Sequence, residues 1–154
     1  MDIRFINPLL SSIVNVLSTM AALEAKPGKP VIKQGVAAPG VVTGMIELKG
    51  AQATGSIAIS LTRPVILDIA RRMLRQEFDE VDDMVVDLAG ELANMMAGGG
   101  KAQLSEQGYE FDLTLPNVIA GTGHDINHTV NGPVVTIPFQ AGTGEFFVEV
   151  CFAE

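Results

Sequence analysis

The sequence has a single cysteine, one tyrosine and no tryptophan. A chain whose only cysteine is Cys151 cannot form an intramolecular disulfide or bind a metal cluster through cysteine ligands. We therefore expect a protein of a reducing compartment, the cytoplasm, in which Cys151 is a structural residue on a strand near the C-terminus.

Basic residues are also few, with ten Lys and Arg against eighteen Asp and Glu, for a net charge of −8. The deficit lies in residues 61–154, which hold five basic and fifteen acidic side chains, a local balance of −10. Such a chain would repel nucleic acid, and it has no basic patch interleaved with aromatic residues. A protein partner with basic groups around its docking site fits this charge better.

Charge is absent altogether from residues 5–23. A signal peptide would begin with basic residues, but Asp2 precedes this run, and polar side chains interrupt it. Its apolar residues follow helical spacing, and Asn7-Pro8 is a suitable helix start. We therefore predict an amphipathic core helix over Pro8–Leu23 and no membrane partner.

The remaining chain predicts an α+β fold in which helices pack on a largely antiparallel β-sheet, with residues 1–154 forming a single domain. Thr62 is expected to cap a second helix that continues to Arg75, and Asp79 through Asp83 to open a third. A glycine-rich loop is expected over Ala120–Gly132. The predicted strands are Val31–Ala37, Val41–Leu48, Gln52–Ser60, Phe111–Leu115, Val134–Phe139 and Glu145–Phe152.

The third helix has two unlike faces. Val85, Ala89, Leu92 and Met96 form an apolar stripe that is suited to burial. Asn is a poor helix former, and Gly costs roughly 1 kcal/mol relative to Ala, so both are unusual on a solvated face. The polar face therefore favours contact with a partner over stability, although a plain solvated face remains the alternative. That face carries Asp83, Asp87, Glu91, Asn94, Gly98 and Lys101.

Other candidate sites are weaker. His124 and His128 are four residues apart, but they lie in a glycine-rich loop, and the chain offers no third Cys or His ligand for zinc. No Ser-His-Asp set or phosphate-binding loop is indicated, so the sequence offers no obvious nucleophile, metal centre or cofactor of its own.

On these residues the chain resembles the CheX-type members of the CheC/CheX/FliY family of chemotaxis phosphatases. The central motif is Asp87-x-x-x-Glu91-x-x-Asn94, extended by Met95 and Gly98. Flanking similarity lies in Ile6-Asn7-Pro8-Leu9 with residues 15–20, in residues 115–124, and in the closing run of residues 147–150. The resemblance covers nearly the whole chain and implies a CheC/CheX-like fold.

The resemblance implies hydrolysis of the aspartyl phosphate on a CheY-like response-regulator receiver domain, which would supply the phosphoaspartate and the Mg²⁺ ion. Asn94 would hold the attacking water in line, and Glu91 would pair with the receiver's active-site lysine. Asp87 would assist docking at the rim, and Gly98 would leave room for the receiver. Family analogy also implies a homodimer joined through sheet edges.

Two features of the chain depart from that pattern. The first helix has Ser11, Ser12 and Asn15 and lacks the second motif of CheC relatives, which implies one active site per chain, as in CheX. The run Gly98-Gly99-Gly100 is expected to kink the third helix or end it early. Two rival hypotheses remain, a non-catalytic adaptor that binds a receiver or signalling complex and a structural dimer whose polar helix face has no role.

Overall fold

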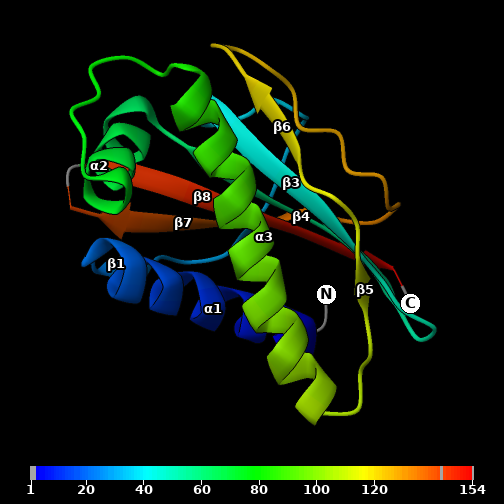
Figure 1. The fold of residues 1–154 in the computed structure, drawn as a ribbon. Helices are drawn as coiled ribbons and strands as arrows, with labels where there is room; N and C mark the ends of the chain where they lie inside the picture. Colours follow the sequence, from blue (N-terminus) through cyan, green and yellow to red (C-terminus); the bar gives the residue numbers. More distant parts are fainter. Residues whose placement is uncertain (1–2, 143, 154) are drawn as a thin grey trace.

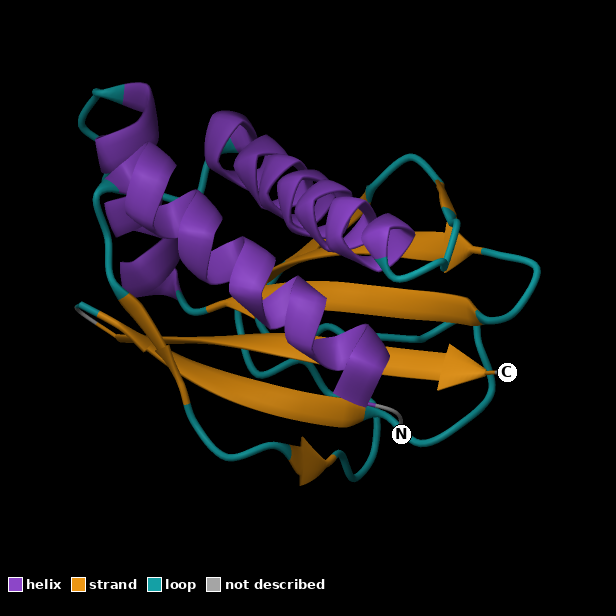
Figure 2. Cartoon of the chain, turned by 90° about the horizontal axis from the view of Figure 1, so that it is seen from below, coloured by secondary structure: helices purple, strands orange, loops and turns teal. Residues whose placement is uncertain are grey.

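The computed structural model describes residues 3–142 and 144–153. In this part of the chain, three helices lie on one face of an eight-stranded antiparallel sheet. The helices are α1 (Ile3–Ala21), α2 (Arg63–Leu74) and α3 (Asp83–Glu106). Figure 2 shows the two layers, helices above and strands below, and the predicted α+β architecture is confirmed.

The sheet has the order β1-β7-β8-β4-β3-β5, with β2 also pairing with β7 and β6 with β3. Its central strands β3, β4 and β8 are long, and each contains several β-branched residues, joined by phenylalanines in β8, whereas the strands at both edges are short. The strands are β1 (Ala25–Pro27), β2 (Val31–Ile32), β3 (Val42–Lys49), β4 (Thr54–Leu61), β5 (Asp112–Leu113), β6 (Asn117–Ala120), β7 (Val135–Ala141) and β8 (Gly144–Ala153).

Strand β8 is buried on both faces. The alternation in its sequence predicts one apolar face, and Phe146, Val148 and Val150 are indeed fully buried under the helices. Glu149 and Cys151, on the other face, are also fully buried. The segment 121–134 covers that second face, where Ile126 is buried and the Cys151 thiol lies 3.3 Å from the Val130 carbonyl.

Helix α1 begins earlier than predicted. It starts at Ile3, so Pro8 lies inside the helix and Asn7 is no cap, which corrects the expected start. The cause is tertiary, because the Phe5 ring stacks on Phe152 at 4.9 Å and holds the first turn on the sheet. By length and composition α1 could cross a membrane, but its apolar stripe is buried, and the prediction of a core helix is confirmed. Leu9, Ile13 and Leu17 are fully buried in this stripe.

The predicted strands are correct at the centre of the sheet and wrong near its edges. The predicted strand Val31–Ala37 reduces to β2, and the sequence analysis missed β1 and β6 altogether. Gly28 and Pro30 separate β1 from β2, which both pair with β7. Within the predicted strand, Gly35 has a φ of +73°, which is incompatible with extended strand backbone. Helix α2 matches its prediction within a residue, with Thr62 as its N-cap residue, although the Thr62 hydroxyl donates to the Glu145 carbonyl and makes no capping hydrogen bond to α2.

Candidate functional site

The first turn of α3 determines where the helix begins, and its buried stripe determines which of its faces is exposed. The Asp82 carboxylate accepts a 3.0 Å hydrogen bond from the Val85 amide, which caps the helix and places a negative charge at its N-terminus. The predicted stripe is fully buried, so the packing of α3 against the sheet fixes which residues face outward. This stripe is Val85, Ala89, Leu92 and Met96.

All four predicted site residues lie exposed on the opposite face of α3, namely Asp87, Glu91, Asn94 and Gly98. Figure 1 shows α3 crossing the sheet with this helix surface uncovered by α1 or α2. Glu91 and Asn94 are three residues apart, so one helical turn brings both side chains to the same surface with a rise of about 4.5 Å. Within residues 3–142 and 144–153 neither side chain has a hydrogen-bond or ion-pair partner. Both are therefore available to an external group.

The glycine run does not end α3, so the predicted early end is wrong. The helix continues through residues 98–100 to Glu106. Packing explains two of the three glycines. A β-carbon on Gly99 would overlap the Ser12 hydroxyl, and one on Gly100 would lie 2.6 Å from Leu9 Cδ2, so both allow α1 to lie close against α3.

Gly98 differs from its neighbours, because a β-carbon there would have no atom within 4 Å. The fold of the described chain gives no reason for glycine at this position, which costs about 1 kcal/mol of helix stability relative to alanine. A bare helix surface one turn beyond Asn94 suits the close approach of another molecule.

Two elements flank this surface. On one side, the Ser12 hydroxyl of α1 donates a 3.3 Å hydrogen bond to the Met95 carbonyl, which joins the two helices beside Asn94. On the other side, β6 packs so closely that a β-carbon on Gly90 would lie 2.8 Å from Val118 Cγ2. The site is therefore a rigid, convex helix face bordered by α1 and β6, which fits a protein surface better than a small molecule.

The family model of the chemotaxis phosphatase CheX matches residues 42–140, which run from the start of β3 into β7 and include all of α3. The chain belongs to the CheX family of chemotaxis phosphatases.

Relatives match along the whole chain. The CheY-P phosphatase CheX of Thermotoga maritima is 27% identical over 148 residues, covering 96% of this chain and 94% of that protein. The crystal structure of a CheC-like superfamily protein from Shewanella sp. PV-4 is 44% identical, covers 100% of both chains and has a TM-score of 0.93. The CheX of the CheX-CheY-BeF3-Mg²⁺ complex from Borrelia burgdorferi is 28% identical, covers 99% and 100% of the two chains and has a TM-score of 0.81.

The far face of this CheX-family sheet carries a buried polar cluster that the sequence analysis missed. His128 Nδ1 lies 2.8 Å from Ser56 Oγ and its Nε2 lies 3.0 Å from Glu149 Oε1, while Lys33 Nζ lies 2.7 Å from Glu149 Oε2. This order of groups looks like a hydrolytic Ser-His-Glu set, but Ser56 is only 1% exposed, so a substrate has no access to its hydroxyl. The cluster is structural and ties the segment 121–134 and Lys33 to the sheet.

The two histidines also have separate roles. His124 Nε2 lies 2.7 Å from Thr43 Oγ1, on a different strand from the partners of His128. Among the described residues, no group of three His, Cys, Asp or Glu side chains is arranged to hold a metal ion. Burial raises the pKa of the Cys151 thiol, which keeps it in the unreactive protonated form.

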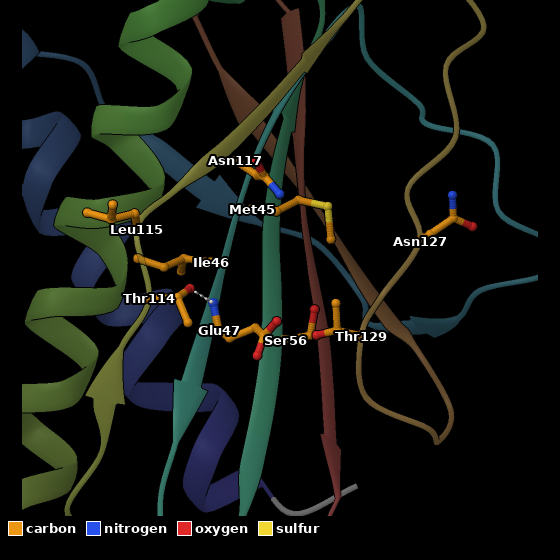
Figure 3. A pocket seen from close by; sticks show the side chains of 9 residues that line it. All are labelled: Met45, Ile46, Glu47, Ser56, Thr114, Leu115, Asn117, Asn127 and Thr129. Carbon is orange, nitrogen blue, oxygen red and sulfur yellow. Dashed lines mark hydrogen bonds between the residues drawn. The ribbon is translucent and has the colours of Figure 1, made fainter.

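A cavity of about 70 Å³ lies between β3, β4 and the segment that leads into β6. Figure 3 shows its lining, which includes Met45, Ser56, Thr129 and the Leu115 side chain. Its volume holds little more than a few water molecules, and it has no arrangement that would bind a cofactor. The candidate site therefore remains the exposed face of α3.

Proposed function

We propose that this protein hydrolyses the aspartyl phosphate of a CheY-like response-regulator receiver domain. The observation that carries the proposal is the exposed pair Glu91 and Asn94, free of partners within the described chain and held on a rigid helix. Two relatives support it, because one is a CheY-P phosphatase and another was crystallised with CheY, BeF3 and Mg²⁺.

In this proposal Asn94 enters the receiver's site and holds a water molecule in line with the phosphorus–oxygen bond. The water oxygen attacks phosphorus, the bond to the aspartate oxygen breaks, and the products are inorganic phosphate and a free carboxylate. A carboxamide is too weak a base to deprotonate water, so Asn94 acts by positioning the water and by excluding other geometries.

Glu91 contributes the docking contact. Its carboxylate is exposed one turn from Asn94 and pairs with the receiver's active-site lysine, which fixes the orientation of the two proteins. Asp87, one turn further toward the N-terminus, adds negative charge at the rim. Gly98 provides the open surface over which the receiver approaches.

The protein brings no metal of its own in this proposal. The Mg²⁺ ion belongs to the substrate, the phosphorylated receiver, where it offsets the charge of the phosphoryl oxygens. The residues of α3 act beside that ion. This assignment keeps the expectation that the chain needs no cofactor and works in the cytoplasm, where receivers are phosphorylated.

We further propose that two chains form a homodimer through a sheet edge. The edge beyond β7 supports this proposal, because β2 exposes two apolar side chains next to unpaired strand edges. Val31 is 53% exposed and Ile32 is 57% exposed. The edge lies across the sheet from α3 and β6, so a dimer formed there leaves both candidate sites open, one on each chain.

The decisive experiment measures inorganic phosphate released from a Mg²⁺-loaded, phosphorylated receiver of the same organism. The reaction is followed with the wild type, with Asn94→Ala, and with no added protein. We expect acceleration by the wild type, and a loss of at least about 10²-fold in kcat for Asn94→Ala with unchanged binding of the BeF3-activated receiver.

Two other results would replace the proposal. Binding of the activated receiver with no acceleration, across the organism's receivers, would favour the adaptor. Absence of binding, together with no effect of changes at Glu91, would favour a structural dimer. Equal losses of binding and hydrolysis in Asn94→Ala would remove the water-positioning role.

A further inference from the structure

Leu115 is the most exposed large apolar side chain in the described part of the chain, at 90% exposure. Single exposed apolar residues are common on protein surfaces and need no explanation by themselves. What distinguishes Leu115 is how rigidly its backbone is held and what lies beside it.

The backbone around Leu115 is fixed on both sides. The Thr114 hydroxyl accepts a 3.0 Å hydrogen bond from the Glu47 amide, and the Thr114 amide donates to the Glu47 carbonyl at 3.1 Å. Pro116 restricts Leu115 to extended conformations, and β6 begins directly afterwards at Asn117, which pairs with Met45 of β3. Because this backbone is already ordered, a partner that covers Leu115 restricts the side-chain rotamers but costs little further backbone entropy.

Leu115 also lies next to the candidate site. A β-carbon on Gly90 would approach Pro116 Cβ at 3.8 Å, so the residue after Leu115 packs against the turn of α3 that precedes Glu91. From there β5 and β6 run alongside α3 (Figure 1). Figure 3 shows the Leu115 side chain directed toward α3, whereas Thr114 is directed toward β3. The apolar side chain therefore borders the exposed face that carries Glu91 and Asn94.

We propose that Leu115 is the apolar anchor of the receiver-docking surface and a determinant of which receiver binds. This inference rests on the proposed function. Phosphoaspartate, Mg²⁺ and lysine are groups that one receiver shares with the next, so contacts from Glu91 and Asn94 discriminate poorly among receivers. A leucine beside them increases the affinity for a receiver that has an apolar depression near its phosphorylation site. It lowers the affinity for a receiver that has charged residues there.

The test is a comparison of Leu115→Gln with Met20→Gln, in steady-state phosphate release from the phosphorylated receiver. Met20 is a matched control, because it is 53% exposed on the last turn of α1 and replaced by the same residue. For Leu115→Gln we expect a rise of about tenfold in KM and in the Kd of the BeF3-activated receiver, with kcat within about twofold of wild type. Met20→Gln should match the wild type in all three quantities.

A conservative variant separates docking from folding. Leu115→Met keeps an apolar side chain and should retain wild-type KM, and all three variants should keep the wild-type Tm because neither site is buried. Unchanged KM and Kd in Leu115→Gln, or a fall in kcat alone, would overturn the assignment of Leu115.

Failure of the proposed function and failure of the Leu115 anchor give different experimental results. If the wild type releases no phosphate from any receiver, the proposed function is wrong, and Leu115 is then judged by Kd for the BeF3-activated receiver alone. A tenfold weaker Kd in Leu115→Gln would still support the anchor. An equal Kd would overturn it.

Discussion

The Leu9 side chain of α1 fills the space directly above Gly100 of α3, where a β-carbon would lie 2.6 Å from Leu9 Cδ2. Two residues earlier, Gly98 faces open space. Two glycines in one helix are therefore present for different reasons. Gly100 permits the packing of α1 on α3, whereas Gly98 has no packing role within the described chain.

This difference predicts opposite effects for the same substitution. Gly98→Ala should raise the free energy of unfolding by about 1 kcal/mol, because alanine is the better helix former. Gly100→Ala should lower it, because Leu9 is fully buried and cannot yield, and overpacking costs about 1–3 kcal/mol. Urea denaturation of both variants measures the two signs.

The same substitution at Gly98 should also change the affinity for the receiver. Gly98→Ala should weaken binding of the BeF3-activated receiver by about tenfold despite its greater stability, since a methyl group would stand in the approach path. Calorimetric titration checks this value. A Gly98→Ala protein that is more stable and binds as well as the wild type would show that the receiver does not approach this surface.

The helix that carries the site was predictable from the sequence because its pattern is local. The apolar stripe from Val85 to Met96 has a clear helical period, and every candidate residue falls on the opposite face of α3. The end of the helix was not predictable, because the run Gly98-Gly99-Gly100 is unfavourable in isolation. Contacts from Ser12 and Leu9, more than 80 residues away in sequence, stabilise it in the folded chain.

Burial by distant segments also explains why the polar cluster on the far face of the sheet could not be predicted from the sequence. Glu149 alternates with apolar residues in β8 and reads as solvent-facing, yet it is fully buried. Its partners His128 and Lys33 come from distant segments, so nothing in the local pattern reveals the cluster. The exposure of Leu115 is hidden for the same reason, since a leucine in a strand-like stretch is normally expected in the core.

The buried cluster predicts a large stability effect at Glu149. Glu149→Gln should lower the free energy of unfolding by about 3 kcal/mol, because it leaves the ammonium of Lys33, whose side chain is only 10% exposed, without its counter-charge. Glu145→Gln is the matched control, because Glu145 is an exposed acid four residues earlier in the same strand, and it should change stability by less than about 0.5 kcal/mol.

Receiver binding should be the same in both variants, because the cluster lies on the face of the sheet opposite α3. Guanidinium denaturation with an unchanged m-value measures the loss of stability. A Glu149→Gln protein as stable as the Glu145→Gln control would show that the ion pair has no net stabilising role.

The proposed dimer predicts a dependence on the β2 edge. Ile32→Lys places a charge on an exposed apolar position and should convert the dimer to a monomer without changing the Tm of the monomer. Light scattering during size-exclusion chromatography, over a range of concentrations, measures the mass. Leu115→Gln, between β5 and β6 at the opposite edge of the sheet, should remain dimeric, and a mass unchanged by Ile32→Lys would place the interface elsewhere.

The last prediction concerns the charge of Glu91. Glu91→Gln keeps the size of the side chain and its helical context but removes the negative charge that is proposed to pair with the receiver's lysine. Loss of one partner in a desolvated charge pair should weaken binding of the activated receiver by at least about tenfold. The salt dependence of the affinity should decrease with it, because one charge contact is lost.

Glu106→Gln is the matched control, since Glu106 is an exposed acid at the other end of the same helix. It removes the same net charge and should leave affinity within about twofold, because a solvated charge at that distance is largely screened. Equal weakening by the two variants would mean that Glu91 acts only through the overall charge of the protein. A loss confined to Glu91→Gln would support a specific contact one turn from Asn94, as docking against the phosphorylated site requires.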